Sequence, residues 1–205
     1  MTAMLEHEVR HRIDNRRGVW QPLLVELGRL FEQMDEAYHH TAAACGFVCR
    51  GCADNCCRSH FHHHTLLEYL YLRQGCFNGG SRLRPRIITR LNAAPAPGDR
   101  RTSNRMCPLN ENERCTLYDH RPMICRLHGV AWEVRGPGQS ITGGPGCALF
   151  TQQSMDRRCR PLDRTPFYQA LAALEGRLRT GLGLNLRIKM TVAEMLKTFA
   201  DDGRV

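Results

Sequence analysis

Cysteines are the residues of this sequence with the most distinctive chemistry, and they are concentrated. Four of the eleven fall within nine residues, in the segment CRGCADNCC from Cys49 to Cys57. So many sulfurs at close range indicate disulfide bonds, a metal site or a redox-active thiol. The N-terminal sequence MTAMLEHEVRHRID is charged and has no apolar stretch like that of a secretory signal, so we expect a cytoplasmic protein with reduced thiols. For reduced thiols, this spacing favours metal binding or catalysis over a disulfide framework.

The first cluster has the pattern Cys49-x2-Cys52-x3-Cys56-Cys57. A two-residue gap lets both sulfurs of the CxxC pair turn toward one ion, while the intervening backbone amides hydrogen-bond to the thiolates. Adjacent side chains such as Cys56 and Cys57 point to opposite faces of an extended chain and are well separated around a helix. We therefore do not expect both to ligate one mononuclear ion. Either they serve two centres, or one is a ligand while the other packs or reacts.

The remaining predicted ligands come from the segments CPLNENERCTLYDHRPMICRLHG and GPGCALF. Together with the first cluster they make eight thiols, enough for two four-sulfur sites or for one cluster with spare thiols. Sulfur ligation suits zinc and iron–sulfur clusters equally. The second half lacks regular CxxC…CxxC spacing, so we favour a 4Fe-4S type iron–sulfur cluster, with zinc (Zn) as the alternative. The predicted metal ligands are Cys49, Cys52, Cys56, Cys57, Cys107, Cys115, Cys125 and Cys147.

This ordered combination resembles the YkgJ-type cysteine-cluster family, also called the CxxCxxCC zinc- or iron-chelating domain. The resemblance covers residues 49 to about 147, and its matching steps are Cys107-Pro108-Leu109, Cys115-Thr116-Leu117-Tyr118 and Arg121-Pro122-Met123-Ile124-Cys125-Arg126. It implies metal binding by about eight cysteines and leaves iron and zinc open. The cysteine motif is also similar to that of flagellin lysine N-methylase, which works with S-adenosylmethionine and an iron–sulfur cluster. The His-rich insert HFHHH and the long arms at both ends depart from the family pattern.

Several residues near the predicted ligands have open roles. Arg121 and Arg126 flank Cys125, where they either neutralise thiolate charge or form part of a solvated helix face. His128, in the spacing Cys125-x2-His128, is the better candidate for an imidazole ligand but is not among the predicted ligands, whereas the histidines of HFHHH are expected on the surface. Three cysteines lie outside the family pattern and are expected to be ordinary thiols: Cys45, Cys76 and Cys159.

Helices are expected on both sides of the cysteines. Residues 22–43 carry an apolar stripe at helical spacing, with Pro22 in the first turn. Capping boxes predict helices that begin at Thr65 and at Thr191, the first of them ending at Gly75. Further expected elements are a helix over 81–92, a loop over 93–104, a hairpin within 131–142, and a helix over 165–181 that Thr165 caps.

The sequence therefore predicts a mainly α fold, in which helices flank an irregular, cysteine-rich metal-binding centre with at most a short β-hairpin. We divide it into an N-terminal amphipathic helical arm (1–44), a cysteine-cluster domain (45–160) and a C-terminal helical segment packed on that domain (161–205). The N-terminal helix could also form a homodimer or bind a protein partner.

The leading functional hypothesis is a cytoplasmic metal-binding protein with a redox, metal-handling or partner-subunit role. The first alternative is an enzyme that depends on S-adenosylmethionine and an iron–sulfur cluster, but the Gly-rich stretch TGGPGC (142–147) is not expected to follow a strand or to open a helix.

A zinc module that binds nucleic acid ranks last. The net charge is +9, but 27 of the 29 Lys and Arg residues are arginines, the exceptions being Lys189 and Lys197. Thiolate ligands would also remove most of the excess positive charge. No run approaches the roughly 18 apolar residues of a membrane span.

Overall fold

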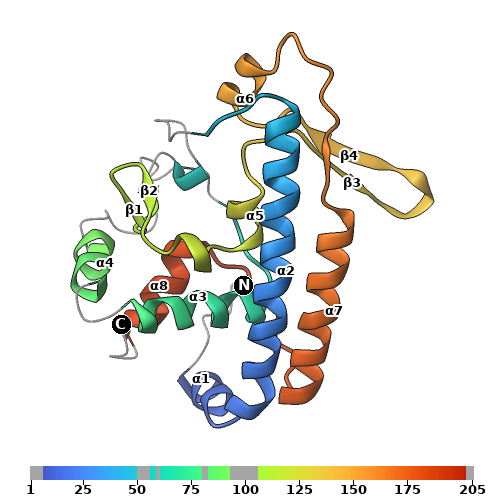
Figure 1. Ribbon diagram of the computed structural model, residues 1–205. Coiled ribbons are helices and arrows are strands. Elements are labelled where there is room, and N and C mark those ends of the chain that lie inside the picture. Colours follow the sequence, from blue (N-terminus) through green and yellow to red (C-terminus); the bar gives the residue numbers. More distant parts are fainter. Residues whose placement is uncertain (1–6, 50–55, 59–60, 80–82, 93–105, 202–205) are drawn as a thin grey trace.

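The computed structural model describes residues 7–49, 56–58, 61–79, 83–92 and 106–201. A long helix, α2 (Arg17–Ala44), runs through the molecule with α7 (Thr165–Leu182) beside it (Figure 1). The apolar stripe predicted for α2 is buried against α3, α5 and α7. Because α2 contacts elements from all three predicted segments, its stripe is used within the chain, and the division into three parts stays a prediction.

The start of α2 differs from the prediction. The helix begins five residues before Pro22, which lies inside it, and an additional helix, α1 (His7–Asp14), precedes it. Trp20 joins the two helices, because its indole Nε1 donates to the carbonyl oxygen of Ile13 at 2.9 Å. Pro22 has no N–H to donate to the carbonyl oxygen of Gly18, four positions before it, so α2 lacks one backbone hydrogen bond in this turn.

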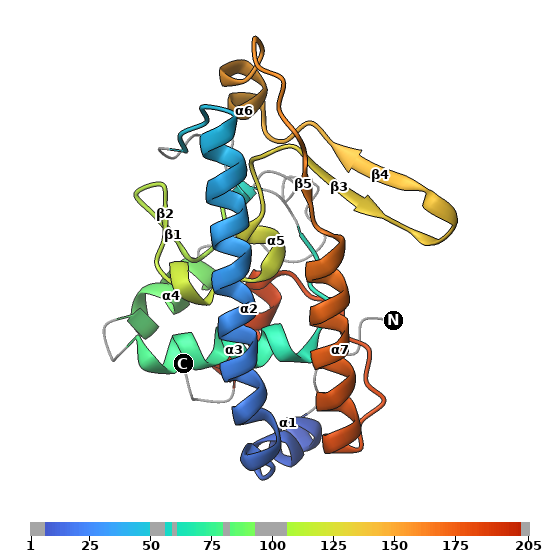
Figure 2. The same ribbon diagram turned by 45° about the vertical axis from the view of Figure 1, so that its right-hand side comes forward.

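The helix α3 (Leu66–Asn78) crosses the α2–α7 pair (Figures 1 and 2). The predicted cap at Thr65 is confirmed, since the backbone N–H of Glu68 donates to the Thr65 hydroxyl at 3.3 Å, while the Glu68 carboxylate accepts from that hydroxyl. The predicted stop at Gly75 is wrong, because the helix continues to Asn78. A Cβ atom at Gly75 would lie 2.4 Å from Cγ of His120, so glycine there permits close contact with the turn η3 (Tyr118–His120).

The predicted C-terminal helices are present. The helix α8 (Val192–Asp201) has its predicted capping box, with Glu194 N–H donating to the Thr191 hydroxyl at 3.3 Å. It packs against α3 and against the predicted helix α4 (Leu83–Asn92). At the start of α7 the predicted cap is wrong: Thr165 is the first helical residue, and its hydroxyl accepts from Arg135 N–H at 2.8 Å instead.

Two small sheets complete the fold. The predicted hairpin is confirmed as β3 (Trp132–Arg135) and β4 (Ile141–Gly144), and it projects to one side of the helices (Figure 2). The expectation of at most one hairpin is wrong. Strand β5 (Leu162–Asp163) pairs in parallel with β3, and β1 (Asn110–Glu111) pairs with β2 (Arg114–Cys115). These two-residue strands are too short to show an alternating pattern, so only pairing identifies them.

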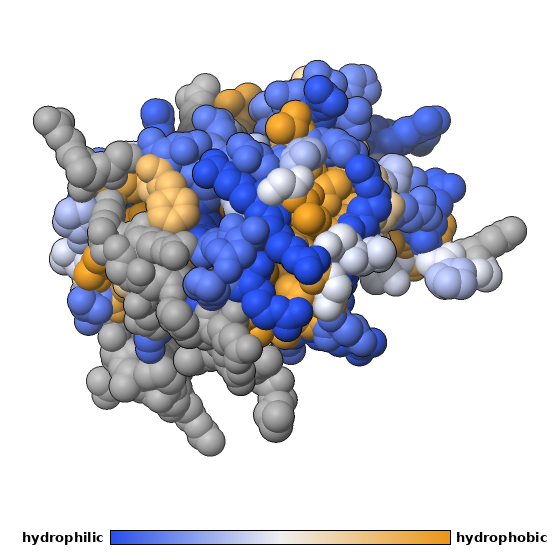
Figure 3. All heavy atoms as spheres, turned by 90° about the horizontal axis from the view of Figure 1, so that it is seen from below, coloured by the Kyte–Doolittle hydropathy of each residue, from blue (hydrophilic) through white to orange (hydrophobic). Residues whose placement is uncertain are grey.

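The Gly-rich stretch 142–147 also differs from the prediction, because its first three residues belong to β4 and its last residue, Cys147, directly precedes α6 (Ala148–Gln153). The strand before it is the edge of an antiparallel hairpin and the helix after it is a short one, so the context is not that of a nucleotide-binding unit. The predicted loop over 93–104 lies outside the described residues. No described helix is long and apolar enough to cross a bilayer. The face seen from below Figure 1 is largely hydrophilic, with small apolar areas between charged side chains (Figure 3).

Candidate metal centre

Five of the predicted ligands converge from four separate stretches of chain. Cys56 and Cys57 lie in the turn η1 (Cys56–Arg58), Cys107 precedes β1, Cys115 ends β2, and Cys125 lies in the short helix α5 (Met123–Arg126). Cys57 forms side-chain hydrogen bonds with the thiols of Cys107 and Cys56. Cys115 and Cys125 are close enough to act electrostatically on the same group. We call these five residues the thiol cluster.

A backbone hydrogen bond fastens the two cysteine segments together. The amide N–H of Cys107 donates to the carbonyl oxygen of Cys57 at 2.7 Å. The same two residues also contact each other through their sulfurs. The adjacent thiols of Cys56 and Cys57 do not point apart as expected, since they hydrogen-bond to each other in the tight turn η1. Whether one or both bind metal stays a prediction.

The thiols of the cluster differ in acidity. Hydrogen bonds from Cys107 and Cys56 lower the pKa of Cys57, because they stabilise its thiolate. Donating these bonds to Cys57 raises the pKa of Cys56 and of Cys107. Burial raises the pKa of Cys115 to about 11. The cluster without metal therefore holds one favoured thiolate and several protons, and metal binding must release those protons.

A tight hairpin positions two of the sulfurs. The turn between β1 and β2 consists of Asn112 and Glu113, which both have positive φ values of 50° and 64°. Two left-handed residues match the twist of a two-residue hairpin, for which Asn is well suited and Glu is not. The backbone N–H of Asn110 donates to the carbonyl oxygen of Cys107 at 2.9 Å, and Asn110 pairs with Cys115. Cys107 and Cys115 therefore lie at the two ends of the hairpin.

Two buried carboxylates connect the helices that position Cys125. Glu175 of α7 accepts the amides of Leu66 and Leu67 at the start of α3, both at 3.0 Å. Glu68 of α3 accepts the amide of Met123 at the start of α5 at 2.9 Å. The side chain of Glu68 is only 5% exposed, and burial raises its pKa. Glu175 thus fixes the N-terminus of α3, and Glu68 fixes that of α5, as N-terminal capping groups do.

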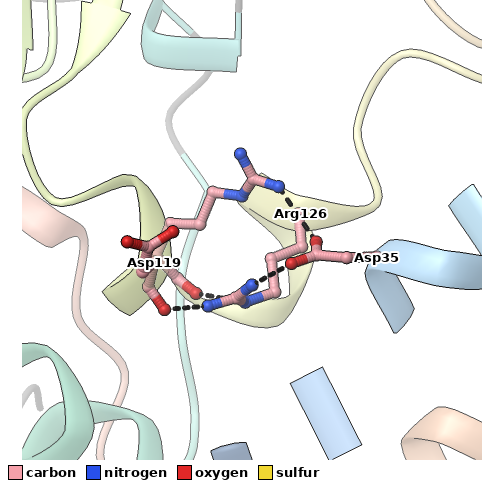
Figure 4. Close-up of polar contacts among 4 residues, drawn as sticks. Asp35, Asp119 and Arg126 are labelled. Atoms are coloured by element: carbon pink, nitrogen blue, oxygen red, sulfur yellow. Dashed lines mark hydrogen bonds and ion pairs between the residues drawn. The ribbon is translucent and has the colours of Figure 1, made fainter. Parts of the chain in front are cut away.

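Two arginines next to Cys125 are buried. Arg126 binds Asp35 of α2 at 2.5 Å and also donates to the carbonyl oxygen of Asp119 (Figure 4). Arg121 binds the other oxygen of Asp35 at 2.9 Å. The interpretation of these residues as a solvated helix face is therefore wrong. Both guanidinium groups act to lower the pKa of Cys115, and two cations shared by one carboxylate leave net positive charge beside the thiols.

The other predicted ligands lie elsewhere or outside the description. Cys49 is exposed just after α2, and the sulfur of Cys147 accepts the amide of Phe150 at 3.4 Å at the start of α6. Burial and then these two thiols raise the pKa of Tyr38, which places both near its hydroxyl. Cys52 lies outside the described residues.

The three cysteines expected to be ordinary thiols are placed as follows. The thiols of Cys45 and Cys159 hydrogen-bond to each other, and burial raises the pKa of Cys45 to about 11. Cys76 is buried in α3, within electrostatic reach of Cys115. His128, in the segment after α5, acts electrostatically to lower the pKa of Cys57. Its ring packs against that of Phe61, with 5.4 Å between the two centroids.

The donor set suits a soft metal, but its geometry is open. Sulfur donors are the ligands that zinc and iron–sulfur clusters prefer. Across the described ranges, no group of three or more His, Cys, Asp or Glu side chains is arranged closely enough to hold a metal ion. The chain therefore brings the sulfurs into one region without closing them into a ligand shell.

Sequence reasoning missed Asp35 and Glu175, and it recognised Glu68 only as a capping residue. A carboxylate inside an otherwise apolar helical stripe was the only available signal. No family model matches the chain, and no curated protein and no solved structure is significantly similar to it. The resemblance to the YkgJ-type family accordingly stays a prediction.

Proposed function

We propose that the chain binds a 4Fe-4S type iron–sulfur cluster through the thiol cluster, with zinc as the alternative ligand. The observation that carries this proposal is the hydrogen bond between Cys107 N–H and the Cys57 carbonyl oxygen, because it joins two cysteine segments fifty residues apart in the sequence. Four sulfurs suffice for either ligand, so the five thiols provide one more than is needed.

The electrostatics support the same proposal. Thiolates close together repel one another, and the net positive charge of Arg121 and Arg126 beside Cys115 and Cys125 offsets part of that repulsion. The hydrogen bonds to Cys57 provide a first thiolate at neutral pH. A bound iron–sulfur cluster would supply one-electron redox chemistry, whereas zinc would act structurally.

Cys49 and Cys147 form a second group beside Tyr38. With Cys52, they are the thiols from which a second centre would be built. A redox, metal-handling or partner-subunit role in the cytoplasm follows from the first centre and does not require this second one.

The test is anaerobic purification followed by iron, zinc and acid-labile sulfide analysis and a visible spectrum. A brown protein with about four iron atoms and about four sulfides per chain is the expected result. A colourless protein with one or two zinc ions would favour the alternative. A protein without either metal, which also fails to bind them after reconstitution, would contradict metal binding altogether.

Matched variants locate the site. Cys107→Ser and Cys125→Ser are expected to lose most of the bound metal, while Cys159→Ser, whose thiol lies outside the thiol cluster, retains it. Circular dichroism of each variant verifies that the helices remain. Equal metal content in all three variants would rule out the thiol cluster as the site.

A further inference from the structure

A cavity of about 650 Å³ lies between α3, α5, β3 and α7. Its volume falls in the range of small-molecule sites. The histidine-rich segment after Phe61, which sequence reasoning placed on the surface, forms one wall, and α7 forms another. The walls include Phe61, His63, Trp132, Arg164, Tyr168 and Ala172.

Arg164 is a buried cation without a carboxylate partner. Arg164 is only 5% exposed, and no ion pair joins it to any carboxylate in the described part of the chain. The guanidinium lies over the Trp132 ring, 4.6 Å from its centroid, donates to the carbonyl oxygen of Leu127 and hydrogen-bonds to the Tyr168 hydroxyl. Its Nε is buried without a hydrogen-bond partner. Burial lowers the pKa of Arg164 to about 10, so the group stays positive at neutral pH.

His63 also has a buried polar atom without a hydrogen-bond partner in the same cavity. It is 3% exposed, and its Nε2 makes no hydrogen bond within the described residues. Its backbone forms two hydrogen bonds with Met190, of 2.8 and 3.0 Å, which anchor the residue at the cavity wall. An unsatisfied buried polar group costs roughly 1–3 kcal/mol, and such groups are rare in native proteins.

The remaining walls define the rest of the ligand. Phe61, Trp132 and Tyr168 contribute aromatic surface, and Leu171 contributes aliphatic surface. Among the described residues that line the cavity, Glu68 is the one carboxylate, and both of its oxygens are engaged, with Met123 N–H and with the Thr65 hydroxyl. Apolar walls together with a few polar atoms that lack hydrogen-bond partners are typical of binding sites for small organic molecules.

We propose that this cavity binds a small organic anion, whose carboxylate or phosphate pairs with Arg164 and accepts a hydrogen bond from Nε2–H of His63, while its apolar body packs against Phe61 and Trp132. Arginine suits this role because its planar fork matches carboxylate and phosphate oxygens. The inference does not depend on metal binding, since neither Arg164 nor His63 belongs to the thiol cluster.

Fluorescence tests the proposal in the full chain. The sequence has two tryptophans, so the Trp20→Phe variant reports on Trp132 alone. The probes are benzoate and phenyl phosphate, with benzamide as the neutral analogue and inorganic phosphate as the anion without an apolar body. The two aromatic anions are expected to change the emission with saturation below about 10 mM, at least about tenfold more tightly than benzamide or inorganic phosphate.

Variants then assign the contacts. Arg164→Met is expected to weaken binding of both aromatic anions at least about tenfold, which corresponds to about 1.4 kcal/mol. Ala172→Trp fills the rim of the cavity, keeps Arg164, and is expected to block binding as well. The control is Arg177→Met in α7. Arg177 binds Glu26 outside the cavity, so this change leaves anion binding unchanged.

Three results would overturn the proposal: no response to either aromatic anion at about 10 mM, equal binding of benzoate and benzamide, or unchanged binding in a folded Ala172→Trp variant. Inorganic phosphate that binds as tightly as phenyl phosphate would remove the apolar body from the proposal and reduce the site to an adventitious ion site.

Discussion

Arg126 illustrates how single residues hold the region around the thiol cluster. Its guanidinium binds Asp35, donates to the carbonyl oxygens of Arg121 and Asp119, and lies 4.2 Å from the ring centroid of Phe31. A buried charge with this many partners is costly to remove on one side only, because the remaining groups lose their hydrogen bonds.

Replacing Arg126 with Met is therefore expected to lower the free energy of unfolding by about 3 kcal/mol. Urea unfolding followed by circular dichroism measures the change. Arg177→Met is the matched control, because its ion pair with Glu26 is exposed and its loss should have a much smaller effect. Similar losses in both variants would show that the Arg126 contacts contribute no more than a surface ion pair does.

His63 gives a prediction for acid pH. Burial lowers its pKa from 6.5 to about 4, so the folded protein holds a neutral ring that the unfolded chain protonates first. Stability from this residue is present above pH 6.5 and is lost as pH falls toward 4, by up to about 3 kcal/mol. In His63→Phe the free energy of unfolding should depend less on pH in this window, as measured by urea unfolding from pH 7 to 4. Parallel curves for variant and wild type would contradict the assignment.

Among the elements, α3 begins at a cap supplied from far along the chain. Glu175 accepts the amides of Leu66 and Leu67 and also the guanidinium of Arg179 at 2.7 Å. Glutamine at this position has one acceptor oxygen, so one amide loses its partner. We expect Glu175→Gln to lower the free energy of unfolding by about 2 kcal/mol and to speed hydrogen exchange at Leu66 or Leu67. Glu194→Gln, at the exposed cap of α8, should cost less; the reverse order would contradict the role of Glu175.

The β1–β2 hairpin contains a residue in an unfavourable conformation. Glu113 has φ 64°, which glycine adopts without strain. Glu113→Gly should raise the free energy of unfolding by about 1 kcal/mol and leave metal content unchanged. The control Glu111→Gly removes the carboxylate that binds Arg90 and is expected to destabilise. Thermal unfolding of both variants decides the prediction, which fails if Glu113→Gly is the less stable of the two.

For the whole molecule, the frame and the proposed metal centre have different sources of stability. The frame rests on buried apolar contacts such as the packed rings of Phe31 and Tyr71, with centroids 5.1 Å apart, and of Tyr69 and Phe199, 4.9 Å apart. The thiol cluster lies on short elements, namely η1, the β1–β2 hairpin with the residues just before it, and the four-residue helix α5. Burial of apolar surface stabilises the helices whether or not metal is present.

Hydrogen exchange of loaded and metal-free protein tests this separation. Removal of the metal should increase exchange in η1 and in residues 106–126 while α2 and α7 stay protected, because ligand binding supplies folding free energy only where the ligands are. A uniform increase along the whole chain would show that the helices also depend on metal. An unchanged pattern would show that metal, if bound, does not organise the thiol cluster.

Features that depend on near neighbours in the chain could be predicted from the sequence. The apolar stripe of α2 and the caps at Thr65 and Thr191 involve residues within a few positions of one another. Periodicity therefore predicts α2, and the capping spacing predicts the starts of α3 and α8, before any packing is known. The spacing of the cysteines predicted a sulfur-rich region, and five of the eight thiols do converge.

Which distant residues meet follows from the packing of the helices and could not be predicted from neighbouring residues. Glu175 caps α3 from over a hundred positions away, β5 exists because β3 offers it a partner, and Gly75 leaves room for the ring of His120. The same holds for Arg164 and His63, whose burial in one cavity has no counterpart in local sequence. Such contacts depend on how the helices pack, and the free energy of packing comes from burial over the whole molecule rather than from neighbouring residues.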